Sequence, residues 1–234
     1  MRKFDYSFLK RISVPADIMN YATSIYEMKA KAELRRSDFA EVFSAMESVA
    51  KIQSVKSSNA IERIITTDKR IRDIVNKSTA PQGHNELEIA GYRDALDLIH
   101  GSYSEIPFSE KSILELHRIL LQPSGDDLAG RYKTEDNFII ETDREGVRSV
   151  RFTTVPASET AFAMEQLILA YHAAYSEAEI NPLMLITCVI LDLLCIHPFR
   201  NVNGRMSRLL SLLLMYKSGF NAGKYVSIEE QINT

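Results

Sequence analysis

The sequence predicts a mostly α-helical protein, and three observations support this prediction. Apolar residues recur at helical spacing through most of the 234 residues. Six of the seven prolines fall between these periodic segments or at their starts, where they do not interrupt a helix. The block from about Pro15 to Lys77 is rich in Ala, Met, Glu and Lys, which are strong helix formers, and it contains no Gly or internal Pro.

The first half of the chain predicts several helices in order. The block from Pro15 to Lys77 is expected to form two or three helices, and the turn-forming stretch from Ser78 to Gly83 ends it. Residues 85–100 follow as an amphipathic helix. Its apolar side consists of Ile89, Tyr92, Ala95, Leu96 and Ile99. Its charged side consists of Glu86, Arg93, Asp94 and Asp97.

A capped helix and a β-hairpin come next. Ser109 is a suitable N-cap for a helix that runs to Leu121, and Pro123 and Gly125 end that helix. Residues 130–154 break the helical rhythm, because two apolar runs flank the polar turn 143–146, which includes Arg144. The runs are Phe138, Ile139 and Ile140, and then Val147, Val150 and Phe152.

The last third predicts three further helices. The first ends at about Tyr175. The second is long and buried, with Asn181 as its N-cap and Pro182 at its first helical position. The third starts near Gly204 and ends at Gly219, a residue suited to the left-handed conformation after a helix. We therefore divide the chain into an N-terminal helical segment (1–80), a core (81–225) and the start of a C-terminal extension (226–234), for which a natural short form and a truncated one are the two alternatives.

Composition excludes several classes of partner. The net charge of −3 gives no positive field to hold nucleic acid. The longest apolar segment, from Leu183 to Ile196, has 14 residues and includes Asp192, so it is shorter than the roughly 20 residues of a membrane span. The N-terminus shows no secretory signal. Cys188 and Cys195 lie in the same apolar segment, where we expect packing rather than a disulfide, which fits a cytoplasmic location.

The loop between the last two long helices contains residues suited to proton transfer and to phosphate binding. Pro198 discourages continuation of the helix before it and leaves His197 at the helix end. Asn203 and Gly204 are expected to adopt positive φ and to turn successive amides toward one point, which suits a phosphate at a helix N-terminus. Arg205 and Arg208 share a face of the following helix and can reach anionic groups. The alternatives are a core histidine at 197 and arginines that pair with nearby carboxylates.

The segment 197–208 resembles the signature of the Fic family, which runs His, any, Phe, any, Asp or Glu, Gly, Asn, Gly, Arg, any, any, Arg. The matching residues are His197, Phe199, Asn203, Gly204, Arg205 and Arg208. The resemblance extends from about Ser57 to Tyr225. It implies a Fic-type helical core in which His197 is the general base that deprotonates a Ser, Thr or Tyr hydroxyl of a protein target, which then attacks the α-phosphate of ATP.

The resemblance also implies roles for the neighbouring residues. The loop of Val202, Asn203 and Gly204 would contact phosphates, Arg205 the α/β region, and Arg208 the γ-phosphate. Phe199 would be a packing anchor. The hairpin resembles the Fic flap, which pairs with an extended target segment by strand addition; the docking residues would be Phe138, Ile139 and Ile140. The alternative is that these two strands form an ordinary surface hairpin without a docking role.

Two residues depart from the signature. Asn201 stands where the family has the acidic ligand of Mg²⁺, and its amide oxygen lacks the charge of a carboxylate. Val202 stands where the family has Gly, which is serious for a β-branched residue if the backbone there has positive φ. Both changes touch the expected phosphate site.

A stretch of the N-terminal helical segment (1–80) resembles the inhibitory motif of Fic proteins, which is Ser or Thr, three residues, Glu, then Gly or Asn. Ser58 and Glu62 match it, and Arg63 takes the last place. Ser58 and Glu62 share one helix face with Ile61 and Ile65, which are expected to pack on the core. The resemblance implies that Glu62 binds the second arginine of the signature and occupies the space of the γ-phosphate. The alternative is a solvated helix face.

Other charged residues carry no predicted chemistry. We interpret His84, Glu86 and Glu88 as a polar helix start and His117 as a core residue. Lys69, Arg70 and Arg72 are expected to form a solvated face.

The sequence thus predicts a self-inhibited, Mg²⁺-dependent protein adenylyltransferase that uses ATP and modifies a target protein or itself. The alternatives are a catalytically degenerate nucleotide-binding regulatory protein, and a Fic enzyme that removes AMP or uses another nucleotide donor. The oligomeric state is open, and a homo-oligomer is compatible with the sequence.

Overall fold

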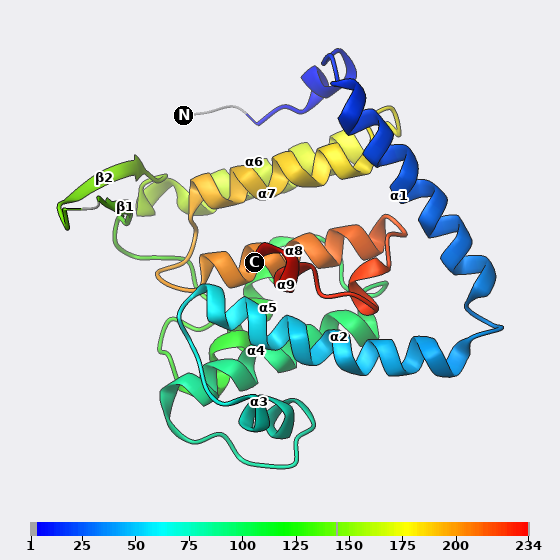
Figure 1. Cartoon of the computed structure of the whole chain (residues 1–234). Helices are drawn as coiled ribbons and strands as arrows, with labels where there is room; N and C mark the ends of the chain where they lie inside the picture. The colour runs from blue at the N-terminus through cyan, green and yellow to red at the C-terminus, as the bar shows by residue number, and fades with distance from the viewer. Residues whose placement is uncertain (1–3, 144, 234) are drawn as a thin grey trace.

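The computed structural model describes residues 4–143 and 145–233, so Arg144 of the predicted turn lies outside the described residues (Figure 1). The helices are α1 (Ala16–Arg35), α2 (Ala40–Ile61), α3 (Asp68–Val75), α4 (Gly83–Ser102), α5 (Glu110–Leu121), α6 (Ala157–Ser176), α7 (Pro182–Ile196), α8 (Asn203–Lys217) and α9 (Ile228–Ile232). Strands β1 (Phe138–Thr142) and β2 (Arg148–Thr153) form the hairpin. Short 3₁₀ turns are η1 (Ser7–Lys10), η2 (Gln122–Ser124) and η3 (Ala222–Lys224). The predicted order of elements is confirmed.

The core forms around α8, which lies between the pair α6 and α7 on one side and the pair α2 and α4 on the other (Figure 1). The predicted apolar side of α4 is confirmed, because its five residues are fully buried. Helices α4 and α5 approach so closely that a Cβ on Gly91 would lie 1.9 Å from the carbonyl oxygen of Leu120. A side chain at this position would therefore force the two helices apart.

Two residues of the predicted charged side of α4, Glu86 and Arg93, are buried. Helix α3 covers them. The Glu86 carboxylate accepts from Arg70 and from the backbone amide of Gln82 at 2.7 Å, and the Arg93 guanidinium donates to the carbonyl of Ile74 at 2.6 Å. The prediction of a solvated face is wrong for Arg70, because its guanidinium pairs with the buried Glu86. Lys69 and Arg72 are exposed as expected.

Local caps define the helix ends as the sequence predicts. The Ser109 hydroxyl accepts from the amide of Ser112, and the Asn181 side chain accepts from the amide of Leu183 with Pro182 at the first helical position. Helix α8 ends at Lys217, and Gly219 has φ +80°. These ends fix where the loop between α7 and α8 begins and ends.

The N-terminal segment forms an arm along one side of the molecule. The turn η1 packs on the body, with Leu9 buried and the Tyr6 hydroxyl donating to Asp192 at 3.0 Å. Helix α1 then runs from the level of α6 and α7 to the level of α2, and none of its residues is buried (Figure 1). Tyr26 packs edge-on against Phe220 with ring centroids 5.2 Å apart. Among the described residues, no helix combines the length and the hydropathy needed to cross a membrane.

Candidate functional site

The loop between α7 and α8 has two residues with positive φ. His197 ends α7 with φ +53°, and Val202 precedes α8 with φ +62°. The prediction of positive φ at Asn203 and Gly204 is wrong, because both are the first residues of α8. The Asn203 side chain closes the loop instead: its Oδ1 accepts from the Phe199 amide at 3.0 Å and its Nδ2 donates to the Phe199 carbonyl at 2.7 Å. Val202 thus makes the turn that the family assigns to Gly.

His197 is half-buried, and one ring nitrogen has a partner in the preceding helix. Its Nδ1 lies 3.4 Å from the carbonyl oxygen of Leu194. A carbonyl only accepts, so Nδ1 carries the hydrogen and Nε2 has the free lone pair. Burial lowers the pKa of His197 and the positive charge of Lys133 lowers it further, while the Leu194 carbonyl and the Glu62 carboxylate act in the opposite sense. The side chain is therefore a neutral base near pH 7.

Phe199 anchors the loop in the core. It is fully buried, and its ring stacks on that of His117 with centroids 3.9 Å apart and an interplanar angle of 10°. The Nδ1 atom of His117 accepts from the amide of Gly130 at 3.0 Å. Burial lowers the pKa of His117 to about 4. The interpretation of His117 as a core residue is confirmed.

Arg205 and Arg208 both pair with carboxylates from distant elements. The Arg208 guanidinium contacts Glu62 at 2.8 Å, the Ser58 hydroxyl at 2.8 Å and the Ser58 carbonyl at 2.9 Å. Arg205 is 3% exposed and donates to Glu88 at 2.5 Å and to the side chain of Asn59 at 3.3 Å. The structure thus shows the alternative in which both arginines are paired.

Glu62 lies directly over the N-terminus of α8. An ideal Cβ on Gly204 would be 2.3 Å from the Glu62 Oε1 atom, so the carboxylate touches the backbone of the first helical turn. The chain reaches this position because α2 ends at Ile61 and turns at Glu62 and Arg63, which has φ +62°. A helix N-terminus is a favourable site for an anion. The Glu62 carboxylate takes that site in this structure.

The prediction that Ile61 and Ile65 pack this helix on the core is wrong. Ile65 is 67% exposed and Ile61 is only partly buried, because α2 stops at Ile61 and helical spacing does not continue beyond it. The most deeply buried residues of α2 are Val55, Ser58 and Asn59, all 0% exposed. Ser58 thus belongs to the buried face, next to Arg208.

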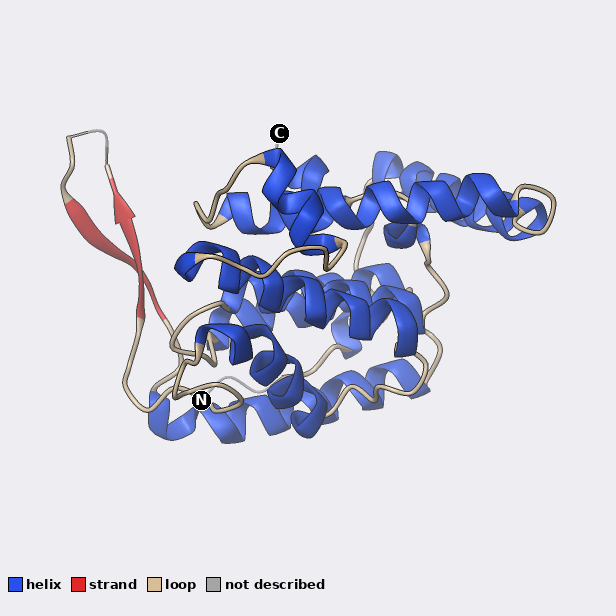
Figure 2. Ribbon diagram, turned by 90° about the horizontal axis from the view of Figure 1, so that it is seen from below, coloured by secondary structure: helices blue, strands red, loops and turns tan. Residues whose placement is uncertain are grey.

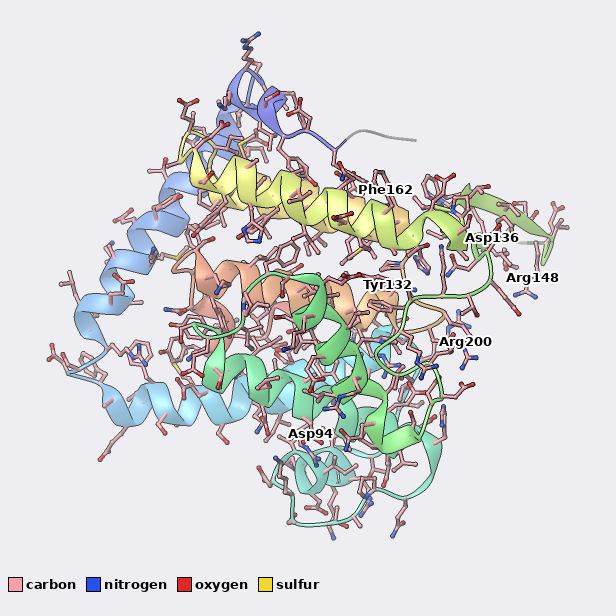
Figure 3. The ribbon with its side chains drawn as sticks, turned by 180° about the vertical axis from the view of Figure 1, so that it is seen from behind. Asp94, Tyr132, Asp136, Arg148, Phe162 and Arg200 are labelled. Carbon is pink, nitrogen blue, oxygen red and sulfur yellow. The ribbon has the colours of Figure 1, made fainter. Side chains whose placement is uncertain are left out.

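A cleft of about 620 Å³ opens beside the N-terminus of α8. The residues that line it include Glu62, Glu88, Val202, Arg205, Arg200 and Asp126. Arg200 and Asp126 pair with each other at 2.9 Å. Figure 3 shows Arg200 at the end of the molecule where Asp136 and Arg148 mark the hairpin. The cleft therefore opens beside the N-terminus of α8 that Glu62 covers, and Arg200 in its wall lies at the same end of the molecule as the hairpin.

Asn201 is exposed on the wall of the same cleft. Within residues 4–143 and 145–233, no three His, Cys, Asp or Glu side chains are grouped as metal ligands. Magnesium bound to a nucleotide takes most of its ligands from phosphates and water and needs only one or two side-chain oxygens. The residues present therefore fit a magnesium ion carried by nucleotide phosphates, with the amide oxygen of Asn201 as the protein ligand.

The hairpin projects from the helical body as an isolated pair of antiparallel strands (Figure 2). Phe138 pairs with Thr153, and the register shifts between Ile139 and Ile140. Phe138 and Ile140 are each 51% exposed, and Ile139 is partly buried. Apolar residues on an uncovered strand edge suit the pairing of an extended segment.

The sequence interpretation missed three residues that hold this site together. Glu88, assigned only to a polar helix start, pairs with Arg205, which is 117 positions away along the chain. Lys133 and Asn137 hold the backbone of the loop from the hairpin side. No local pattern marks these contacts, because each depends on how distant elements pack. A lysine or asparagine beside a hairpin is usually a solvated residue.

The comparisons with known proteins all point to one family. A profile of the Fic/DOC family matches residues 107–215. The protein adenylyltransferase fic-1 of Caenorhabditis elegans is 32% identical over 142 residues, which is 58% of this chain and 25% of that protein. The protein adenylyltransferase Fic of Nematostella vectensis is 27% identical over 178 residues, which is 73% of this chain and 39% of that protein. The chain thus spans between 25% and 39% of the length of these relatives.

Solved structures share the fold. A Fic family protein from Desulfovibrio desulfuricans G20 superposes with a TM-score of 0.76 at 19% identity, covering 95% of this chain and 64% of that chain. A Fic domain containing signaling protein from Bacteroides thetaiotaomicron superposes with a TM-score of 0.71 at 22% identity, covering 83% of this chain and 73% of that chain. At these identities the likeness establishes the fold, and the chemistry must be argued from the residues of this chain.

Proposed function

The chain belongs to the Fic/DOC family through residues 107–215, and from this premise we propose that it is a protein adenylyltransferase restrained by its own Glu62. It would transfer AMP from ATP to a Ser, Thr or Tyr hydroxyl of a protein, the chain itself included. The curated relatives are named protein adenylyltransferases, which supports this reaction class. The observation that carries the proposal is the neutral His197 in the loop that leads to the N-terminus of α8, where Arg205 and Arg208 lie.

The transfer step follows from these positions. Nε2 of His197 accepts the proton of the target hydroxyl, and the hydroxyl oxygen forms a bond to the α-phosphorus of ATP. The bond from that phosphorus to the bridging oxygen of the β-phosphate breaks, and pyrophosphate leaves. The first amides of α8, together with Arg205 and Arg208, stabilise the charge on the phosphates. A bound Mg²⁺ ion, held through Asn201, would neutralise part of that charge.

The hairpin would select and align the target. An extended segment of the target adds as a strand to the uncovered edge of β1, with the apolar side chains of Phe138, Ile139 and Ile140 as the docking surface. Such pairing fixes the backbone of the target and leaves its hydroxyl side chain to reach His197. Main-chain pairing carries little sequence information, so the identity of the target depends on these side chains.

The place of Glu62 supports the proposed self-inhibition. Its carboxylate pairs with Arg208 at 2.8 Å and covers the backbone of Gly204. A γ-phosphate that needs the same arginine has to displace this carboxylate. Removal of the carboxylate should therefore release the enzyme, because Arg208 and the α8 N-terminus become available together.

A second candidate is a nucleotide-binding regulatory protein that has lost catalysis. The observation that favours it is Val202, whose positive φ places a β-branched residue in a conformation that strains the turn before the phosphate site. This protein would bind ATP in the same cleft but would not transfer AMP. Removal of AMP by the same site is a third reading, and it would need Glu62 rather than be restrained by it.

The test is incorporation of α-labelled ATP into protein by the wild type, by Glu62→Gly, and by Glu62→Gly combined with His197→Ala, with Mg²⁺ present. The expected result is label in the single variant and none in the double variant. Glu105→Gly removes an exposed glutamate in another turn and serves as the matched control, with label at the wild-type level. Absence of label in all variants, despite measurable ATP binding, would favour the regulatory protein or another nucleotide donor.

A further inference from the structure

Both stems of the hairpin are tied to the loop that carries His197 by three polar side chains. Lys133 and Asn137 precede β1, and Thr154 follows β2; we name these three residues the stem clamp. Lys133 is 4% exposed and Thr154 is 5% exposed, and Asn137 is partly buried. The Thr154 hydroxyl lies 2.6 Å from Oδ1 and 2.7 Å from the backbone carbonyl of Asn137, so the two stems are joined to each other.

The ammonium group of Lys133 is the centre of the clamp. Its Nζ donates to Asn137 Oδ1 at 2.8 Å, to the Thr154 hydroxyl at 2.9 Å and to the Ile196 carbonyl at 3.2 Å. These contacts use all three donors of the group, and each acceptor is neutral. Burial lowers the pKa of Lys133 to about 8, and the carboxylate of Asp136 acts in the opposite sense. The Ile196 carbonyl ends α7, where the helix dipole favours a cation.

The clamp reaches four consecutive carbonyl groups, those of residues 196–199. Beside the contact to Ile196, the backbone amide of Lys133 donates to Pro198 at 2.9 Å. The Asn137 side-chain amide donates to the carbonyl of Phe199 at 3.0 Å and, more weakly, to that of His197 at 3.5 Å. The segment in which His197 takes its positive φ is thus held from outside by the hairpin stems.

The clamp attaches both stems of the hairpin to the helical body, and the Asp136 carboxylate adds a contact to the start of α6 by accepting from the Ala157 amide at 2.7 Å. In the described part of the chain, the two strands contact each other extensively, and no helix packs extensively against either of them. The clamp does not contact Arg205 or Arg208, which pair with Glu88, Ser58 and Glu62; its one link to the phosphate loop is the Phe199 carbonyl, which accepts from both Asn137 and Asn203. A change at Lys133 or Thr154 can therefore alter the hairpin without removing a contact of these arginines.

We propose that Lys133, Asn137 and Thr154 are positioning residues, which fix the hairpin, and any target strand paired with it, relative to Nε2 of His197. This proposal rests on the proposed function and names residues that serve the same reaction. A strand bound to a mobile hairpin would present its hydroxyl over a range of places, and small misplacements of reacting groups reduce rates strongly. The clamp removes that freedom at both stems.

The experiment compares clamp variants with matched surface variants in the Glu62→Gly background. Thr154→Val keeps the shape of the side chain and removes its hydroxyl, and Lys133→Met keeps the length and removes the ammonium. Thr23→Val in α1 and Lys111→Met on α5 are exposed controls. We expect both clamp variants to lower the rate of self-labelling from α-labelled ATP about tenfold to hundredfold, with the Kd for ATP unchanged. The control variants should label at the rate of the Glu62→Gly parent.

Two readouts do not depend on activity. Amide hydrogen exchange of residues 138–153 should become faster in both clamp variants and not in the controls, because the strands lose their attachment. In an NMR titration, Lys133→Met should raise the pKa of His197, since a positive charge near the imidazole is removed. Unchanged exchange in the hairpin together with labelling at the parent rate would overturn the proposal.

If the proposed function is wrong, the labelling and exchange experiments give a different pattern of results. If the Glu62→Gly parent takes up no label, the transferase assignment fails, and hydrogen exchange alone decides whether the clamp fixes the hairpin to the loop. Faster exchange in both variants then supports the clamp, and exchange like that of the controls overturns it. Thermal unfolding of each variant shows whether the rest of the fold is intact.

Discussion

Val202 has a backbone conformation that β-branched residues rarely adopt. Its φ of +62° and ψ of +14° lie in the left-handed region, where Gly has no steric cost. We expect Val202→Gly to raise the free energy of unfolding by about 1 kcal/mol, because the relief of strain exceeds the entropy that Gly adds to the unfolded chain. Urea unfolding measures the change. The control is Val49→Gly on the exposed side of α2, which should lose about 1 kcal/mol.

The space for a side chain at Gly204 is taken up by the Glu62 carboxylate. A Cβ there would lie 2.3 Å from the Glu62 carboxylate, so Gly204→Ala should displace that carboxylate and cost about 1 to 3 kcal/mol of unfolding free energy. In the Glu62→Gly background the same substitution should be nearly neutral. A double-mutant cycle by urea unfolding measures the difference as a coupling energy. Equal costs in both backgrounds would contradict the contact.

His117 makes stability depend on pH. Its pKa is about 4 in the folded protein, against 6.5 for an unperturbed imidazole, so the unfolded chain binds a proton more readily. Stability is therefore lost as the pH falls below about 6.5, by about 2 kcal/mol between pH 7 and pH 5. His117→Asn keeps an acceptor for the Gly130 amide and cannot titrate, so it should lose less over this range. Unfolding at the two pH values tests the sign, and an equal loss in the variant would contradict it.

At the scale of elements, the close approach of α4 and α5 depends on one glycine. Gly91→Ala would place a methyl group 1.9 Å from the Leu120 carbonyl oxygen and push the two helices apart. We expect a loss of about 3 kcal/mol of unfolding free energy or more, measured by thermal or urea unfolding. Gly101→Ala is the matched control in the same helix, because nothing lies within 4 Å of its Cβ. That variant should gain up to about 1 kcal/mol.

The elements themselves could be predicted because their signals are local. Caps at Ser109 and Asn181, the polar turn of the hairpin and helical periodicity each involve residues close together in sequence. The burial of Glu86 and Arg93 could not be predicted, since it depends on α3 folding over one side of α4.

The site shows the same limit. The spacing of the motif placed His197 at a helix end and brought Arg205 and Arg208 to the first turns of the next helix. The contact of Arg208 with Glu62, expected from the resemblance, is present at 2.8 Å. The residue with positive φ is Val202 and not Asn203, because the Asn203 side chain forms hydrogen bonds with the backbone of Phe199. Backbone conformation in a loop depends on such closures, which composition does not reveal.

At the scale of the whole molecule, the parts to which we assign a function lie at one end. The hairpin, the loop between α7 and α8, and the C-terminal end of α2 lie together, whereas α1 runs along the opposite side (Figure 1). These parts come from three separate regions of the chain. The proposed base His197, the proposed inhibitory residue Glu62 and the proposed target surface therefore lie at the same end of the molecule.

The arm formed by α1 should be the most easily opened helix. It has no buried residue over 20 positions, and stability against local opening depends on buried contacts. We expect its amides to exchange with deuterium orders of magnitude faster than those of α7 and α8, which form the core. Hydrogen exchange with mass spectrometry measures this directly. Protection of α1 equal to that of α8 would contradict the expectation and would indicate that another surface covers the arm.

The stem clamp has a consequence for how specificity can change. Lys133, Asn137 and Thr154 lie outside both strands. We therefore expect that the hairpin between Asn137 and Thr154 can be exchanged for one of different length or composition while His197 keeps its place. Under the proposed function, the hairpin is then a replaceable segment on a constant helical body. New targets could be acquired by grafting a foreign hairpin between the stems, with no redesign of the nucleotide cleft.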